Sequence, residues 1–148
     1  MKVDEAERAL LAAPWRVLEE SALAPTSTGR LRLFDRVTGL WPEGGRAGLG
    51  AIRAERAIAA SDWYFGAHFF QDPVQPGSLG VDALFQLAEV ILAAEGRRAV
   101  VETPAPGEEV EWHYRGQVTP ERERVVLDVE VIEDDGERVV CEGRLWVD

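Results

Sequence analysis

The sequence has few of the residues that build disulfide and metal sites. Among 148 residues it holds one cysteine, Cys141, and two histidines, His68 and His113. A single cysteine excludes an internal disulfide and is typical of a reducing compartment, so we expect a cytoplasmic protein. Two well-separated histidines and one cysteine do not make a zinc site, and we expect no bound metal.

Long hydrophobic runs and a basic N-terminal flank are also missing. No apolar run approaches the roughly 20 residues that a membrane-spanning helix needs, so we expect no membrane association. The first residues carry the acids Asp4, Glu5 and Glu7 where a secretory signal would carry basic residues. Export by that route is therefore not expected.

Positive charge is scarce. The formal net charge is −11, and residues 102–148 hold 14 acidic against 5 basic side chains. A surface this acidic repels phosphate backbones, so nucleic-acid binding is disfavoured unless a local basic patch overrides the field, and we expect no nucleic-acid partner.

Hydrophobic patterning predicts one α+β domain over residues 1–148. Helices are expected over 4–13 and 78–95, the second with Ser78 as its N-cap and Gly96 as its C-cap. Strands are expected over 30–37, 47–58, 109–118, 124–133 and 138–147, with a hairpin turn at 134–136. The helix over 78–95 has few charges and must be covered on most sides. In so small a domain, a curved antiparallel sheet wrapped around that helix satisfies this requirement.

The strand patterns place Leu31 and Leu33 together on one face of the segment 30–37. In the acidic C-terminal strands, we expect the charges to occupy a solvated sheet face. His113 lies on the face opposite Trp112 and Tyr114, which favours an exposed or pairing surface role for it.

Two residues near the long helix suggest acid–base chemistry. His68 lies in a loop that Pro73 and Pro76 stiffen, and taken by itself it is better interpreted as a packed core histidine. Asp82 lies one turn into the helix among apolar neighbours, where a carboxylate is costly without a partner or a task. Gln86, four residues on, can bind it. Gly77 can offer a backbone N–H and the positive helix end to a developing oxyanion.

The segment 64–87, YFGAHFFQDPVQPGSLGVDALFQL, strongly resembles the active-site segment of hotdog-fold β-hydroxyacyl-thioester dehydratases. It is similar to the bacterial decanoyl-type dehydratase/isomerase. It most resembles the dehydratase domains of polyunsaturated fatty acid synthases and polyketide assembly lines. Histidine before Phe, the Asp-Pro-Val-x-Pro-Gly run, Leu-Gly-x-Asp and a Gln four residues later all match. The resemblance covers residues 30–145 well.

The resemblance implies a role for each of these residues. His68 would remove the α-proton of a 3-hydroxyacyl thioester, and Asp82 would protonate the leaving hydroxyl. The Gly77 amide would stabilise the thioester oxygen, the Val74 carbonyl would orient His68, and Gln86 would hold Asp82. Phe85 and Ser78 would line the acyl tunnel.

The resemblance also implies the assembly and the partners. The histidine of one subunit would meet the acid of its neighbour, which makes a homodimer with two composite sites. The substrate would be carried on acyl carrier protein or coenzyme A, in fatty acid or polyketide biosynthesis. No cofactor is needed, because loss of water moves only protons.

Other functions remain open from the sequence. They are an enoyl isomerase or cyclase that uses the same pair, a hotdog thioesterase, and a non-catalytic hotdog that binds carrier protein. A Ser78–His68–Asp82 nucleophilic triad is a further alternative, although Ser78 is better explained as the helix cap. An acidic carrier protein would need local arginines for docking, either Arg97 and Arg98 or Arg30 and Arg32.

Overall fold

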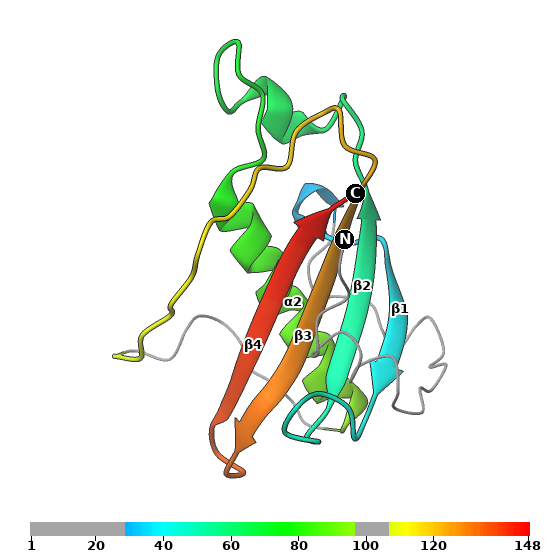
Figure 1. The fold of residues 1–148 in the computed structure, drawn as a ribbon, viewed down its shortest axis with the longest axis vertical. Coiled ribbons are helices and arrows are strands. Elements are labelled where there is room, and N and C mark those ends of the chain that lie inside the picture. Colours follow the sequence, from blue (N-terminus) through cyan, green and yellow to red (C-terminus); the bar gives the residue numbers. More distant parts are fainter. Residues whose placement is uncertain (1–28, 97–106) are drawn as a thin grey trace.

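The computed structural model describes residues 29–96 and 107–148 and shows one long helix packed on a four-stranded antiparallel sheet. The strands are β1 (Arg36–Trp41), β2 (Ala51–Ala57), β3 (Arg124–Asp134) and β4 (Val139–Val147), in the order β1-β2-β3-β4. The long helix is α2 (Gly77–Ala94), and the short 3-10 turns are η2 (Gly29–Leu31) and η3 (Trp63–Gly66). Figure 1 shows α2 along one face of the sheet, with the η3 loop projecting beyond the sheet end. The expected helix over 4–13 lies outside the described residues.

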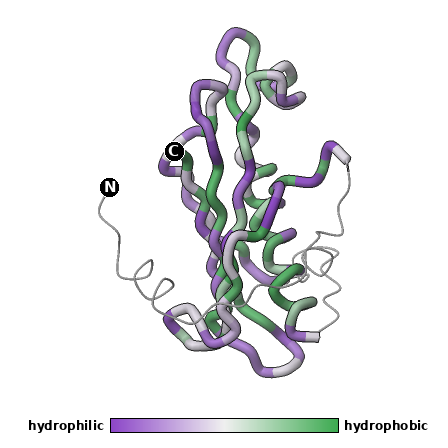
Figure 2. The backbone as a smooth tube through the Cα atoms, turned by 90° about the vertical axis from the view of Figure 1, so that its right-hand side faces the viewer, coloured by the Kyte–Doolittle hydropathy of each residue, from purple (hydrophilic) through white to green (hydrophobic). Residues whose placement is uncertain are grey.

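The core forms between α2 and the inner face of the sheet. Alternate strand residues point toward the helix, so Ile52, Leu127 and Val129 are buried against Leu87 and Ile91. Figure 2 shows hydrophobic residues along the strands and along α2. Burial of such side chains contributes about 1.5–3 kcal/mol each, which makes this layer the main source of stability.

The apolar character of α2 serves this packing. By length and composition alone its 18 residues could cross a membrane, with a mean hydropathy of 1.4. One third of those residues are buried within the chain. The sheet covers one side of α2, whereas the sequence predicted cover on most sides.

The boundaries of α2 differ slightly from the prediction. The helix begins at Gly77, and its N-cap is Pro76, which offers no side-chain hydrogen bond. Ser78 is therefore already inside the first turn, and its predicted role as N-cap is wrong. At the other end the helix stops at Ala94, with Glu95 as C-cap and Gly96 next to it at φ 75°. The predicted C-cap, Gly96, therefore lies one residue beyond the observed one, at a position where a left-handed conformation after the last turn favours glycine.

The segment 30–37 is mostly not a strand. Its start forms η2, and β1 begins only at Arg36. Leu31 is exposed while Leu33 is buried, so the two do not share a face. The backbone of both residues is bound by the Gln86 side chain instead of a neighbouring strand, which explains the departure.

The segment 109–118 was also predicted as a strand, and this is wrong for the described chain. These residues form neither helix nor strand. A backbone hydrogen bond from the Gln75 N–H to the Val118 oxygen, 2.9 Å, joins the segment to the loop before α2. Alternation identifies two faces of an extended segment, but a strand also requires a neighbouring strand to pair with.

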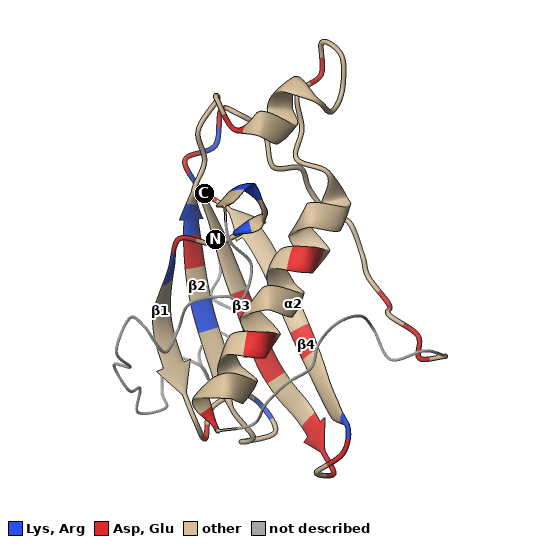
Figure 3. Cartoon of the chain, turned by 180° about the vertical axis from the view of Figure 1, so that it is seen from behind, with Lys and Arg blue, Asp and Glu red and all other residues tan. Residues whose placement is uncertain are grey.

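The outer face of the sheet holds paired rather than solvated charges. Arg53 on β2 donates to Asp128 on β3 from two of its three guanidinium nitrogens, Nε and Nη2, at 2.7 and 2.8 Å. Asp128 and Glu130 are each only 6% exposed, and Glu130 accepts from the Arg46 backbone N–H at 2.8 Å. Figure 3 shows basic residues on β2 and acidic residues on β3. Much of the acidity here is therefore neutralised by arginine, because buried carboxylates require such partners.

Candidate active site

The loop between β2 and α2 is anchored by a buried tyrosine. The Tyr64 hydroxyl donates to the Asp62 carboxylate at 2.8 Å, and the Arg56 guanidinium lies 3.2 Å from the same carboxylate. Arg56 also stacks over the Tyr64 ring, 5.1 Å from its centroid. Burial, followed by the bond to Asp62, raises the pKa of Tyr64, so its hydroxyl remains a donor. This cluster fixes the start of the loop that carries His68. Sequence reasoning missed it, although an Asp two residues before a Tyr was visible.

His68 is held by the loop's own backbone. Its Nδ1 lies 3.1 Å from the Val74 carbonyl oxygen, and the Val74 N–H donates back to the His68 carbonyl at 2.9 Å. A carbonyl oxygen only accepts, so Nδ1 carries the proton in the neutral ring and Nε2 keeps its lone pair. The imidazole is thereby oriented with Nε2 able to take a proton. The half-buried ring also packs on Phe69, with centroids 3.8 Å apart.

Asp82 lies in the second turn of α2 and is bound by Gln86. The Gln86 amide nitrogen donates to Asp82 Oδ2 at 2.9 Å. Asp82 was expected in apolar surroundings, but it is an exposed carboxylate on the open side of the helix. Val81, Ala83 and Leu84 are neighbours in sequence that point elsewhere around the helix, because successive residues lie about 100° apart.

Gln86 connects the helix to the chain before β1. It is 3% exposed, and its oxygen accepts from the Leu33 N–H at 3.1 Å. Its nitrogen donates to the Leu31 carbonyl at 2.8 Å as well as to Asp82. Both the oxygen and the nitrogen of this buried amide are engaged, which orients it toward Asp82.

Gly77 is the first residue of α2, so its N–H has no partner within the helix. The space beside its α-carbon is filled by the ring of Tyr114, since a β-carbon there would lie 2.0 Å from the Tyr114 hydroxyl oxygen. A side chain at position 77 is thus excluded by Tyr114. From the sequence, Gly77 was expected to offer its N–H to a developing oxyanion, and the contact with Tyr114 was not predicted.

The remaining site residues surround the start of α2. Ser78 is exposed and Phe85 is half-buried. Within the described part of the chain, no hydrogen bond joins His68 to Asp82 or to Ser78, so a Ser78–His68–Asp82 triad is not assembled. His113 is exposed and bonds Glu111 at 2.8 Å, as its position on the strand pattern predicted.

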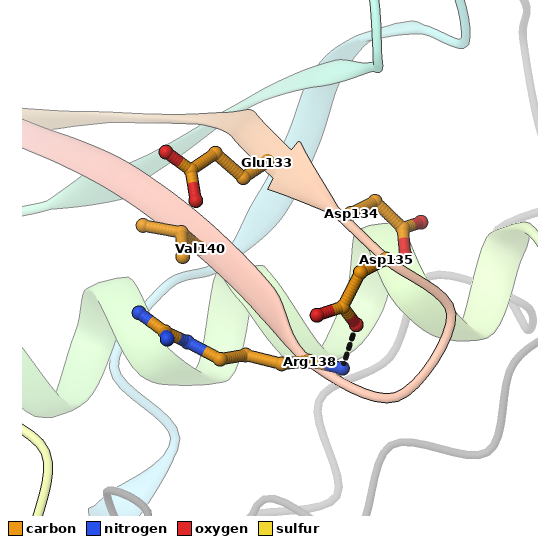
Figure 4. Close-up of a pocket in the computed structure, with 5 residues that line it drawn as sticks. All are labelled: Glu133, Asp134, Asp135, Arg138 and Val140. Atoms are coloured by element: carbon orange, nitrogen blue, oxygen red, sulfur yellow. Dashed lines mark hydrogen bonds between the residues drawn. The ribbon is translucent and has the colours of Figure 1, made fainter.

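A pocket in the described part of the chain lies away from this site. It has a volume of about 120 Å³ and is lined by Glu133, Asp134, Asp135, Arg138 and Val140 (Figure 4). These residues form the β3–β4 turn, at the opposite end of the sheet from the η3 loop (Figure 1). Asp135 accepts backbone N–H bonds from Arg138 and Glu137, which lower its pKa. The pocket is therefore a feature of the turn, and the expected acyl tunnel beside Phe85 is not formed by these residues.

Metal binding has no candidate in the described ranges. Across residues 29–96 and 107–148, no group of three His, Cys, Asp or Glu side chains is arranged to hold an ion.

The Cys141 thiol is expected to react slowly with alkylating reagents. Burial is the main cause that raises its pKa from 9.0 to about 11, and Glu95 and Asp134 add to the effect. At pH 8 the folded protein then holds about a hundredfold less thiolate than an ordinary thiol would. Iodoacetamide labelling followed by mass measurement should be about 10²-fold slower for the folded than for the urea-unfolded chain. Equal rates would show that the thiol is accessible and unshifted.

Replacing Gln86 with leucine is expected to lower the free energy of unfolding by about 2 kcal/mol. The Leu33 N–H and Leu31 carbonyl lose their partner, and leucine cannot replace either bond. Urea unfolding followed by circular dichroism measures the change. Gln117→Leu is the matched control, because Gln117 is exposed, and it should differ from wild type by less than about 0.5 kcal/mol. Equal losses in the two variants would contradict the assignment.

The sequence was also compared with protein families and with known proteins. Residues 26–148 match the FabA-like domain family. One chain of the polyunsaturated fatty acid synthase of Thraustochytrium sp. (strain ATCC 26185 / S-3) is 39% identical over 114 residues. That match covers 70% of this chain and 8% of the synthase chain, so this chain spans less than a tenth of the relative's length.

The arrangement of one long helix on an antiparallel sheet agrees with the hotdog fold expected from the sequence. With a family match over residues 26–148, the chain belongs to the FabA-like hotdog dehydratase domains.

Proposed function

We propose that this chain dehydrates a 3-hydroxyacyl thioester to the 2-enoyl thioester. The observation that carries the proposal is the bond between His68 Nδ1 and the Val74 carbonyl, 3.1 Å, which leaves Nε2 as a base. The bond from Gln86 to Asp82, 2.9 Å, supports the second half of an acid–base pair. Membership of a family of dehydratase domains favours this reaction over others that use the same residue types.

The proposed reaction transfers protons and breaks two bonds of the substrate, the α C–H bond and the β C–O bond. His68 Nε2 takes the α-proton, and the C–H electrons move toward the thioester carbonyl, whose oxygen gains negative charge. The Gly77 N–H at the positive end of α2 stabilises that oxygen. Asp82 in its acid form protonates the β-hydroxyl, the C–O bond breaks, water leaves and the α,β double bond forms.

The contributions expected of these groups are substantial. One preorganised oxyanion donor contributes about 3–4 kcal/mol, and a positioned acid or base contributes roughly 10²- to 10⁴-fold. Together they make abstraction of a weakly acidic α-proton by histidine feasible. The carbonyl of Val74 and the amide of Gln86 act as orienting groups for the base and the acid.

The active unit is proposed to be a homodimer with composite sites. His68 lies in the loop that projects beyond the sheet, whereas Asp82 lies exposed on the open side of α2. Phe69 and Phe70, next to His68, are 60% and 91% exposed, which is unusual for large apolar side chains. Pairing of two copies would cover these rings and bring His68 of one copy to Asp82 of the other. The acyl chain would run in the tunnel so formed, with Phe85 and Ser78 in its lining.

The substrate is proposed to arrive on acyl carrier protein or coenzyme A, in fatty acid or polyketide synthesis. Of the two proposed docking pairs, Arg97 and Arg98 lie outside the described residues. In the other pair, Arg32 is already bound to the carbonyls of Phe34 and Asp35 at 3.2 and 2.7 Å. This makes Arg30 the better candidate of that pair.

The test is to incubate the chain with short 3-hydroxyacyl thioesters and follow the products by mass. Loss of one water from the intact thioester is the expected result. Free acid would instead identify a thioesterase, and conversion of a 2-enoyl to a 3-enoyl thioester would identify an isomerase. Binding of acyl carrier protein without turnover of several chain lengths would identify a non-catalytic hotdog, and the dehydratase proposal would be wrong.

A further inference from the structure

The first residue of α2 is covered by an aromatic side chain from a distant segment. The Tyr114 ring approaches Gly77 so closely that a β-carbon there would meet ring atom Cε1 and the hydroxyl oxygen at 2.0 Å. A β-carbon would overlap these ring atoms. The ring can therefore lie here only because residue 77 is glycine and has no side chain. The two residues are 37 positions apart in the chain and meet only in the folded state.

One contact packs Tyr114 within its own segment, and another joins that segment to the loop before α2. The Trp112 ring packs against it edge-to-face, with centroids 5.2 Å apart and planes at 80°. Farther along, the Gln75 N–H donates to the Val118 oxygen at 2.9 Å and joins this segment to the loop just before α2. In Figure 1 the segment, drawn in yellow, passes the first turn of α2.

The aromatic pair still leaves much of its surface open. Tyr114 is 61% exposed and Trp112 is 42% exposed. Aromatic rings that pack on a site but remain half open offer a large apolar contact area to a ligand at low cost in side-chain entropy. The ring lies against Gly77, the residue whose N–H the proposed reaction assigns to the thioester oxygen.

We propose that Tyr114 is a substrate-binding residue whose ring forms one wall of the thioester site beside Gly77. This inference rests on the proposed function and extends it to the substrate's thioester end. The ring packs against the thioester sulfur and the adjoining carbon of the carrier arm, a favourable sulfur–aromatic contact. It also keeps water away from the Gly77 N–H, and a hydrogen bond to the oxyanion is stronger in such a low-dielectric environment.

The first test compares Tyr114→Ala with Tyr114→Phe in steady-state dehydration of a short 3-hydroxyacyl thioester. Loss of the ring is expected to lower kcat/KM about tenfold or more, mainly through KM, whereas phenylalanine retains the wall and stays within about threefold. The effect of alanine should be the same for short and long acyl chains, because the contact is at the thioester end. His113→Gln is the matched control, since His113 is the exposed neighbour in the same segment, and it should match wild type.

The second test measures binding without turnover. Butyryl-pantetheine lacks the β-hydroxyl, so calorimetry gives a Kd that does not depend on dehydration. Tyr114→Ala is expected to weaken binding about tenfold, and Tyr114→Phe to leave the Kd within about threefold. If Tyr114→Ala does not fold by circular dichroism, Tyr114→Leu is measured instead, because it keeps apolar volume without the aromatic ring.

The outcomes separate this proposal from the proposed function. An unchanged KM and Kd in Tyr114→Ala, equal losses in Tyr114→Phe, or an equal loss in His113→Gln would each overturn the role of the ring. If the wild-type chain binds butyryl-pantetheine but dehydrates nothing, the dehydratase proposal fails. The role of Tyr114 then depends on the Kd values alone.

Discussion

Replacing His68 with alanine is expected to lower kcat for dehydration by about 10²- to 10⁴-fold, with a much smaller change in KM. The imidazole is the base of the proposed reaction, and its Nδ1 is occupied by the Val74 carbonyl. No other nitrogen base in the described loop is placed to replace Nε2. The rate is measured by following enoyl thioester formation at saturating substrate.

His113→Ala is the matched control, because it removes the other histidine from an exposed position bonded to Glu111. It should retain wild-type rate. A second variant, His68→Gln, keeps a side chain able to donate to Val74 but has no basic nitrogen, and it should be as inactive as alanine. Substantial activity in either His68 variant, with the fold intact by circular dichroism, would remove His68 from the mechanism.

Replacing Asp82 with asparagine is expected to lower kcat by a similar factor, about 10²- to 10⁴-fold. Asparagine has nearly the same shape and can still accept a hydrogen bond from Gln86, but it cannot supply a proton to the leaving hydroxyl. The fold should be preserved, because Asp82 is exposed and asparagine keeps an oxygen that accepts from Gln86. Asp72→Asn, an exposed aspartate in the His68 loop, is the control and should remain active.

Mixing the two inactive proteins tests whether the site is composite. In a two-fold dimer, one protomer with His68→Ala and one with Asp82→Asn form one site with both defects and one intact site. After unfolding and refolding an equal mixture, about a quarter of wild-type activity should return, since about half of the dimers are mixed. If both residues of a site come from the same protomer, the mixture will stay inactive.

Local sequence patterns were sufficient for the elements with strong periodicity. The long helix is confirmed within one residue at each end, and the hairpin of β3 and β4 is confirmed with its turn. Both depend on interactions between residues close in the chain, helical spacing in one case and a turn between alternating strands in the other. The hotdog fold itself was inferred through the resemblance of residues 64–87, and the family match confirms it.

Patterns failed where a distant group binds the backbone. The backbone around Leu31 and Leu33 is bound by Gln86, more than 50 residues away, and so forms no ladder there. The segment 109–118 alternates like a strand, but the described sheet has no edge paired with it. Periodicity predicts which residues share a face. It does not predict which other segment will pack on that face or bind that backbone.

Within the candidate site, helical spacing predicted the contact of Gln86 with Asp82, and the family resemblance implied the contact of His68 with Val74. The His68–Val74 bond spans six residues and the Asp82–Gln86 bond spans four, so loop and helix geometry are enough to form them. The exposure of Asp82 and the cover of Gly77 by Tyr114 became visible only in the folded chain. Exposure and contact between distant segments depend on how whole elements pack, and no local spacing in the chain encodes that arrangement.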